Sequence, residues 1–344
     1  MTRRDAGAGL RREPKRPASL VPHRGDARGL AVAAAALVVA LVLPGLLNTY
    51  YVRIITGIFL FGILASAWNL IGGYTGYPDF GGAAFIGIGA YTTGILMVRA
   101  HLPFPAALPA GCLLAAASAV AMGALLLRLR GHYFAIATLG FMLVLRQLTA
   151  NLELTGGGSG MNLPPAGDFK VFYYWMLAGL ALAVLAGFAL PRTRAGYAIA
   201  AIRENQDAAQ VLGIEPLPFK ILAYAANAFL FAAAGGIYAY WLTFIDPPTV
   251  FNIDFTVQAV VMALFGGPGT VLGPAAGAVI LKSLDVTLTN VSLFLHNVFF
   301  GALVCALVIF APRGLAELFQ ARPGSGRAAA LRASIREALQ ENRV

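Results

Sequence analysis

Residues 196–213, GYAIAAIRENQDAAQVLG, form the longest polar helical pattern in an otherwise apolar chain. Apolar residues recur along it at roughly helical spacing, at Ile199, Ile202, Ala209 and Leu212. Gly213 suits the end of a helix, and two prolines shortly after it prevent continuation. Because apolar segments lie on both sides, this short charged helix is well placed to dock on a soluble partner. The pattern alone is equally consistent with a solvated loop helix that contacts nothing.

The composition of the whole chain indicates a membrane protein. Of its 344 residues, 59% are hydrophobic and 12% are charged, whereas a soluble domain carries about 25% charged residues. The mean hydropathy of +0.75 agrees with a chain that resides in a bilayer. Cys112 and Cys305 both lie in apolar runs, and the four His residues are scattered. We therefore expect neither a disulfide framework nor a metal site, and no cofactor.

The distribution of basic residues along the chain indicates which segments lie on the cytoplasmic side of the membrane. The formal net charge is +10, yet 20 of the 25 Lys and Arg residues fall in four polar segments. These segments are residues 1–29, 128–132, 191–220 and 313–344. Clustering of this kind is what the excess of Lys and Arg in cytoplasmic loops produces. The distribution therefore predicts no nucleic-acid partner, a membrane lipid environment, and cytoplasmic N- and C-termini.

Nine apolar stretches approach or exceed the roughly 20 residues that cross a bilayer as a helix. They cover residues 30–47, 54–71, 83–98, 102–127, 133–150, 171–190, 221–245, 255–281 and 291–311. Helices satisfy their own backbone hydrogen bonds, as lipid requires, whereas barrel strands would be about 10 residues long and would alternate. The sequence thus predicts an all-α, polytopic integral membrane protein with about 8–10 transmembrane helices.

This division gives three segments. Residues 1–29 are basic, rich in Pro, Gly and Ala, and aperiodic, which predicts a disordered cytoplasmic tail. Residues 30–312 form the transmembrane domain. Residues 313–344 carry apolar residues every four positions among Arg and Glu, at Leu331, Ile335 and Leu339. That spacing predicts either a short amphipathic helix on the inner surface or a frayed solvated tail.

Counting crossings predicts that one apolar stretch is interrupted. With the first tail inside, the basic segments 128–132 and 191–220 also fall inside, and the basic C-terminal tail should do so too. Three simple crossings between the last two regions would leave that tail outside. Residues 255–281 are the candidate, because Gly266-Gly267-Pro268-Gly269 divides them into two arms of about a dozen residues. We predict a re-entrant hairpin or two half-helices there.

A second interruption, GGYTGYPDFGG at residues 72–82, separates two earlier stretches. Its FGG echoes the FGG at residues 265–267, and paired glycine-interrupted segments in two halves point to a pathway built from inverted repeats. Glycines there expose the backbone, while hydroxyl and carboxyl groups offer polar contacts. The residues predicted to line a translocation path are Tyr74, Thr75, Gly76, Tyr77, Asp79, Gly81, Gly266, Gly267 and Gly269. An ordinary cytoplasmic loop at residues 72–82 is the alternative.

No enzymatic motif occurs in the sequence. The pattern G-x-x-x-x-G-K-[ST] is absent, and the glycine-rich residues 155–160 lack a lysine, so the chain cannot bind ATP in the P-loop manner. The acidic residues are few and lie near the ends of apolar stretches, and the candidates among them are Asp79, Glu153, Asp246, Asp254 and Asp285. We therefore expect no enzyme. The lack of acids within the stretches also speaks against an ion-coupled carrier that acts alone.

Five motifs, in order, resemble the permease of branched-chain amino acid ABC importers, specifically the LivM-type inner-membrane subunit. The first is GGYTG at 72–76 running into GGAAFIGIGAY at 81–91, and the second is LRLRGHYFAIATL at 127–139. The others are LTGGGSGM at 154–161, the 196–213 segment, and GGPGTVLGP at 266–274. Together they span most of residues 30–312.

The resemblance implies a permease subunit of the bacterial inner membrane. It implies two cytoplasmic ABC ATPases, a second, LivH-like permease and a periplasmic substrate-binding protein, with ATP hydrolysis in the separate ATPases. Residues 196–213 are then the coupling segment. We expect its apolar side chains to enter a groove of the ATPase, its charged side chains to contact the rim, and Gly213 to end the helix. The apolar residues are Ile199, Ile202 and Leu212, and the charged ones are Arg203, Glu204 and Asp207.

The same resemblance leaves the substrate open. The family often has Gln, Ser and His where this chain has Tyr77, Asp79 and Gly82. Branched-chain or related amino acids are the expected substrates. Permeases for urea or short amides share the pattern, and an ion-coupled carrier is a further alternative.

Overall fold

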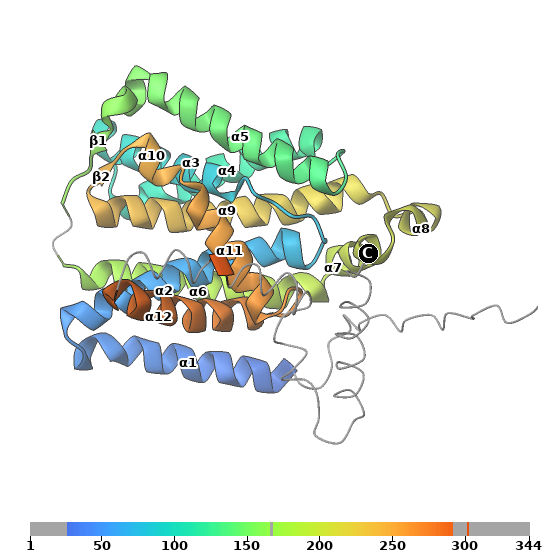
Figure 1. The fold of residues 1–344 in the computed structure, drawn as a ribbon, viewed down its shortest axis with the longest axis horizontal. Helices are drawn as coiled ribbons and strands as arrows, with labels where there is room; N and C mark the ends of the chain where they lie inside the picture. The colour runs from blue at the N-terminus through green and yellow to red at the C-terminus, as the bar shows by residue number, and fades with distance from the viewer. Residues whose placement is uncertain (1–25, 166–167, 292–300, 303–344) are drawn as a thin grey trace, which may run out of the picture.

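The computed structural model describes residues 26–165, 168–291 and 301–302, and its long helices lie roughly side by side (Figure 1). Most of the predicted basic tail, most of the apolar stretch 291–311 and all of the C-terminal segment 313–344 lie outside the described residues. The amphipathic pattern of Leu331, Ile335 and Leu339 is among the predictions that fall outside them.

Nine of the described helices have 14 or more residues. They are α1 (Asp26–Leu46), α2 (Thr49–Trp68), α3 (Gly82–Arg99), α4 (Phe104–Leu126), α5 (His132–Asn151), α6 (Lys170–Ala189), α9 (Pro216–Leu242), α11 (Ile253–Gly266) and α12 (Gly273–Val291). The shorter elements are α7 (Arg194–Glu204), α8 (Gln206–Val211), α10 (Pro247–Val250) and the antiparallel strands β1 (Met161–Asn162) and β2 (Phe244–Ile245). A π turn, Asn69–Gly73, extends α2, and 3-10 turns lie at Glu153–Thr155, Gly157–Ser159 and Leu190–Arg192.

The prediction of an all-α polytopic membrane protein is confirmed. Within the described residues, seven helical segments are long and apolar enough to span a bilayer, the longest being Pro216–Leu242 with 27 residues. The apolar part of α1, Ala31–Leu46, is shorter, and α12 carries Lys282 and Asp285 and is not among the seven. The two strands together hold four residues, and their pairing joins two connecting segments locally.

Helix α9 is the centre of the bundle. It packs against α3 and α4 on one side and against α2 and α6 on the other (Figure 1). Glycines allow the closest approach: a Cβ on Gly235 would lie 2.3 Å from the Ile86 carbonyl oxygen, and one on Gly89 would lie 2.2 Å from that of Ala232. Close backbone packing of this kind is how helices associate where lipid removes the hydrophobic driving force.

The stretch 255–281 is interrupted where the sequence predicts it. Helix α11 ends at Gly266, and α12 begins at Gly273. Gly267 and Gly269, which lie between the two helices, have φ angles of 109° and 83°. Residues with a Cβ rarely adopt such angles. The arms are longer than expected, because α10 precedes α11 in a 20-residue segment and α12 runs on to Val291. The interruption therefore joins two substantial helices.

Candidate functional site

The two glycine interruptions lie against each other. The Asn69 Nδ2 donates to the Thr270 carbonyl oxygen at 2.8 Å, and the Gly269 amide donates to Asn69 Oδ1 at 2.7 Å. A Cβ on Gly73 would lie 2.7 Å from the Gly269 nitrogen, so only glycine fits at that point. We call Asn69, Gly73, Gly269 and Thr270 the glycine crossing. It brings together two segments that the sequence related only by a three-residue echo.

Helix α7 lies over this crossing. A Cβ on Gly269 would be 2.6 Å from an Arg203 guanidinium nitrogen, and one on Gly76 would be 3.5 Å from Arg203 Cγ. Gly76 and Gly269 were predicted for the translocation path, and Arg203 for the coupling segment. The structure therefore places one predicted coupling residue directly on two predicted path residues.

The coupling segment is two helices rather than one. The Thr193 hydroxyl accepts from the Gly196 amide and begins α7, and α7 ends at Glu204. The Asn205 side chain then accepts from the amides of Asp207 and Ala208, both at 3.0 Å, and begins α8. This is N-capping by the residue types that favour it. Gly213, with φ of 83°, follows the end of α8, as the sequence predicts.

The burial of the coupling residues corrects one expectation. Ile199 and Ile202 are only 1% and 4% exposed, because they pack into this chain's own core. They are therefore not available to enter a groove on a partner. At the tip of α8, Val211 and Leu212 are 88% and 79% exposed. The helical spacing does not single out Val211, although two adjacent apolar residues directly before Gly213 are a visible signal. Arg203, Glu204 and Asp207 are exposed, as expected for rim contacts.

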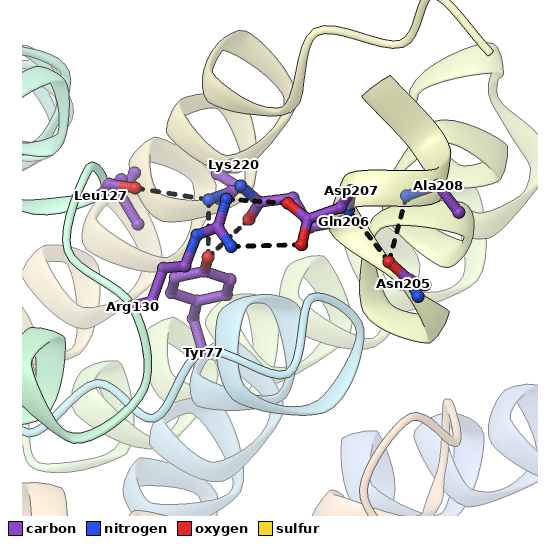
Figure 2. Close-up of polar contacts among 8 residues, drawn as sticks. All are labelled: Tyr77, Leu127, Arg130, Asn205, Gln206, Asp207, Ala208 and Lys220. Carbon is purple, nitrogen blue, oxygen red and sulfur yellow. Dashed lines mark hydrogen bonds and ion pairs between the residues drawn. The ribbon is translucent and has the colours of Figure 1, made fainter. Parts of the chain in front are cut away.

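A polar cluster connects α8 to three other segments (Figure 2). Lys220 Nζ donates to the Tyr77 hydroxyl at 2.7 Å and to the Leu127 carbonyl oxygen at 3.3 Å. The Tyr77 hydroxyl donates to Gln206 Oε1 at 2.7 Å. Beside them, Arg130 and Asp207 form a 2.9 Å ion pair, with both side chains more than half exposed. We call Tyr77, Gln206 and Lys220 the α8 link.

The electrostatics of the α8 link follow from burial. Loss of solvent around Tyr77 raises the pKa of its phenol above the ordinary value, so the hydroxyl keeps its proton. It can therefore donate to Gln206 while it accepts from Lys220. Lys220 and Gln206 were not predicted as site residues. Lys220 was counted only as part of a basic segment, and its burial depends on contacts distant in sequence.

Asp79 is fully buried in the non-helical segment 74–81. Its Oδ1 accepts from the Gly81 amide at 2.9 Å, and its Oδ2 accepts from Asn227 Nδ2 at 3.1 Å. The Trp68 indole donates to its carbonyl oxygen at 2.8 Å. Asn227 lies near the middle of α9. Asp79 therefore follows the end of an apolar stretch in the sequence, but in the folded chain it lies beside the middle of a long helix and not at its end. The carboxylate is satisfied by hydrogen bonds from neutral groups.

The other predicted path residues hold their segments in place. Tyr74 donates to the Gly187 carbonyl oxygen at 2.9 Å, and the Thr75 hydroxyl donates to that of Ile71. A Cβ on Gly81 would lie 2.6 Å from the Thr138 carbonyl oxygen, and one on Gly266 would lie 1.9 Å from that of Gly273. These positions are closely packed in the described conformation. A role for them in a translocation path remains a prediction.

Comparison with known proteins identifies the family to which the chain belongs. Residues 50–311 match the family model described as "Branched-chain amino acid transport system / permease component". The chain is 30% identical over 317 residues to the high-affinity branched-chain amino acid transport system permease protein LivM of Escherichia coli (strain K12), which covers 82% of this chain and 73% of that protein. It is 25% identical to the probable branched-chain amino acid transport permease protein LivM of Methanocaldococcus jannaschii, over 74% of this chain and 90% of that protein.

A third relative is named for a different cargo. The autoinducer 2 import system permease protein LsrC of Salmonella paratyphi B is 27% identical over 81% of this chain and 85% of its own length. No solved structure matches the chain significantly. The family model covers most of the chain, including all of the glycine crossing and the α8 link. The chain therefore belongs to the permease component family of the branched-chain amino acid transport system.

Proposed function

We propose that this chain is a permease subunit of an ATP-binding-cassette importer for branched-chain or related amino acids. It forms a translocation path together with a second, LivH-like permease. A periplasmic binding protein delivers the substrate, and two cytoplasmic ATPases supply the energy. The observation that carries the proposal is the exposed apolar tip of α8, formed by Val211 and Leu212.

The tip of α8 has the chemistry of a docking site for a soluble protein. Two large apolar side chains project from a short helix that carries exposed charged residues, among them Asp207. Interfaces of this type combine an apolar anchor with a polar rim. Ile199 and Ile202 of the preceding helix are buried and fasten α7 to the bundle. Force applied to the tip would therefore reach the membrane helices.

The charges near α8 support a cytoplasmic position for this end of the bundle. Arg130 pairs with Asp207, so the loop between α4 and α5 lies at the same end as α8. Arg192, Arg194 and Arg203 belong to the segment that leads into α8. An excess of Arg and Lys in short loops is typical of the cytoplasmic side. With this orientation, α8 meets the compartment that holds ATP.

The proposed path follows the two glycine interruptions. Non-helical backbone at membrane depth is tolerated only where protein or water covers it. Segment 74–81 and the α11–α12 connection are both non-helical, and the glycine crossing joins the α11–α12 connection to the π turn Asn69–Gly73 that leads into segment 74–81. In the described conformation these segments are closely packed. Transport then requires that ATP-driven movement of α8 separates these contacts in alternation with closure.

The substrate class rests on the relatives. Two LivM proteins are named for branched-chain amino acids, and LsrC is named for autoinducer 2 import. The higher identity and the extent of the LivM matches favour amino acids. Measurement of radiolabelled leucine binding to the importer's periplasmic binding protein would decide between these cargoes.

Purification of the tagged chain from its own membranes tests the proposal. We expect two ATPases and a second permease to co-purify, and leucine uptake to require ATP. Leu212→Asp should abolish ATPase co-purification, because it places a charge in an apolar contact, while Glu204→Ala at the rim should retain it. Uptake that continues without ATP but stops with an uncoupler would contradict the proposal and favour an ion-coupled carrier.

A further inference from the structure

Few side chains connect α8 to the interior of the bundle. Helix α8 has six residues, with an extended residue, Asn205, before it and a left-handed Gly213 after it. Both ends can therefore absorb a rotation of α8 as a unit. Gln206, the first residue of α8, is the side chain bonded to Tyr77. Ala209, buried at 2% exposure, supplies an apolar contact on the same helix but no directional bond.

Lys220 makes the next step of this connection rigid. Lys220 is only 2% exposed, and its side chain forms no ion pair among the described residues. Its ammonium group instead donates to Tyr77 and to the Leu127 carbonyl oxygen, and it lies 4.1 Å from the centroid of the Tyr77 ring. A buried ammonium that loses a partner is costly, so Lys220 holds Tyr77 firmly against α9.

Tyr77 is in turn joined to the buried Asp79 by a short, stiff piece of chain. Only Pro78 separates them, and its ring restricts one backbone dihedral angle. The Tyr77 ring packs edge-on against Phe134 at 5.5 Å, and Phe134 packs against Tyr224 at 6.0 Å. Asp79 is bonded to Asn227 in the middle of α9. A displacement of the Tyr77 side chain would therefore move groups deep in the bundle.

We propose that the α8 link of Gln206, Tyr77 and Lys220 transmits the movement of α8 to segment 74–81, so that these three are positioning residues that couple ATP hydrolysis to opening of the path. This inference rests on the proposed function and deepens it. Docking and transmission are separate roles: the exposed tip binds the partner, and the half-buried first turn of α8 conveys its movement. The Arg130–Asp207 pair lies beside the link but is exposed, and pairs of that type contribute little.

The test uses the intact importer reconstituted in proteoliposomes with its binding protein and radiolabelled leucine. The measured quantity is leucine taken up per ATP hydrolysed. Gln206→Leu cuts the link at its half-buried end and leaves the Lys220–Tyr77 bond in place. Tyr77→Phe removes the shared hydroxyl and keeps the ring against Phe134. Each should lower the ratio about tenfold, the effect of about 1.4 kcal/mol, with the ATPases still bound.

Two further variants separate transmission from a structural role. Gln206→Glu keeps an oxygen that accepts from Tyr77 and should restore the ratio to within about twofold of the wild type. Arg130→Gln removes the neighbouring exposed pair and should leave the ratio unchanged. An unchanged ratio in both Gln206→Leu and Tyr77→Phe would overturn the inference. Loss of ATPase binding in Gln206→Leu would also overturn it, because the link would then serve docking.

The failure of the proposed function gives a different result. If the wild-type chain purifies without ATPases, the importer assignment itself is refuted before any ratio is measured. If the wild-type importer couples normally and the link variants do so too, the importer assignment stands and the link is refuted.

Discussion

Asn69 and Gly269 lie 200 residues apart in the sequence, and a 2.7 Å hydrogen bond from the Gly269 amide to the Asn69 side chain joins them. The same side chain donates to the Thr270 carbonyl oxygen. One amide group therefore satisfies a donor and an acceptor of an irregular turn that no helix or sheet ladder can serve. The Arg203 side chain of α7 lies against this turn.

Asn69→Ala should lower the stability of the permease. It leaves the Gly269 amide and the Thr270 carbonyl oxygen without these partners, at a cost of about 1–3 kcal/mol. Thermal unfolding in detergent would show a lowered midpoint. Asn151→Ala is the matched control, because within the described part of the chain the exposed Asn151 side chain bonds only to the Gln147 carbonyl oxygen of its own helix. Equal shifts for the two variants would contradict a special role for the crossing.

Ile202→Asp should damage folding rather than partner binding. Ile202 is buried in the chain, so the substitution places an unpaired carboxylate in the core. We expect a loss of monodisperse protein on size-exclusion chromatography. Leu212→Asp should behave as the wild type in the same assay, because Leu212 is exposed. A well-folded Ile202→Asp variant would show that α7 faces a partner after all.

Asp79→Ala should be more harmful than Asp79→Asn. Alanine leaves the Gly81 amide and the Asn227 side chain without an acceptor, whereas asparagine keeps one oxygen in place. The difference in the free energy of unfolding should be about 1–3 kcal/mol. Denaturation monitored by tryptophan fluorescence is suitable, since Trp68 contacts the Asp79 backbone. Equal losses in the two variants would mean that the charge, and not the hydrogen bonds, is required.

Gly235→Val should force α3 and α9 apart. Its Cβ would lie 2.3 Å from the Ile86 carbonyl oxygen, a backbone atom that cannot rotate away. Overpacking of this kind costs about 1–3 kcal/mol or more. Gly140→Ala on α5 is the control, because among the described residues no atom beyond the neighbouring turns of its own helix lies within 4 Å of a Cβ there. We expect a lower unfolding midpoint for the first variant and an unchanged or slightly raised one for the second.

Several structural features could be predicted from local sequence alone. The positions of the apolar stretches predict which residues become long helices, because length and hydropathy decide what a bilayer accepts. Gly213 predicts the end of α8, and Gly266 to Gly269 predict the break between α11 and α12. Each of these depends on residues within a few positions of one another.

The candidate site could be predicted only in part. Gly76, Gly269 and Arg203 were each singled out, but their proximity was not. The inward face of α7 was also misjudged, since helical spacing identifies an apolar face without stating what covers it. Asn69 and Asn227 are not recognisable as site residues from the sequence, because a single polar residue in an apolar stretch carries no periodic signal. Gln206 and Lys220 lie in a polar segment, where nothing in the local pattern distinguishes them from solvated neighbours.

The sequence by itself determined that this chain is a helical membrane permease with two glycine breaks and a polar connecting segment. Only the tertiary structure decided that the breaks meet, that Ile199 and Ile202 face inward, and that Lys220 is buried against Tyr77. The physical reason is the distance along the sequence over which each interaction acts. Hydropathy, helix capping and backbone strain act over a few residues. The Asn69–Gly269 and Tyr77–Lys220 bonds instead join residues 200 and 143 positions apart, and these bonds and the burial of Ile199 and Ile202 exist only when the helices are packed.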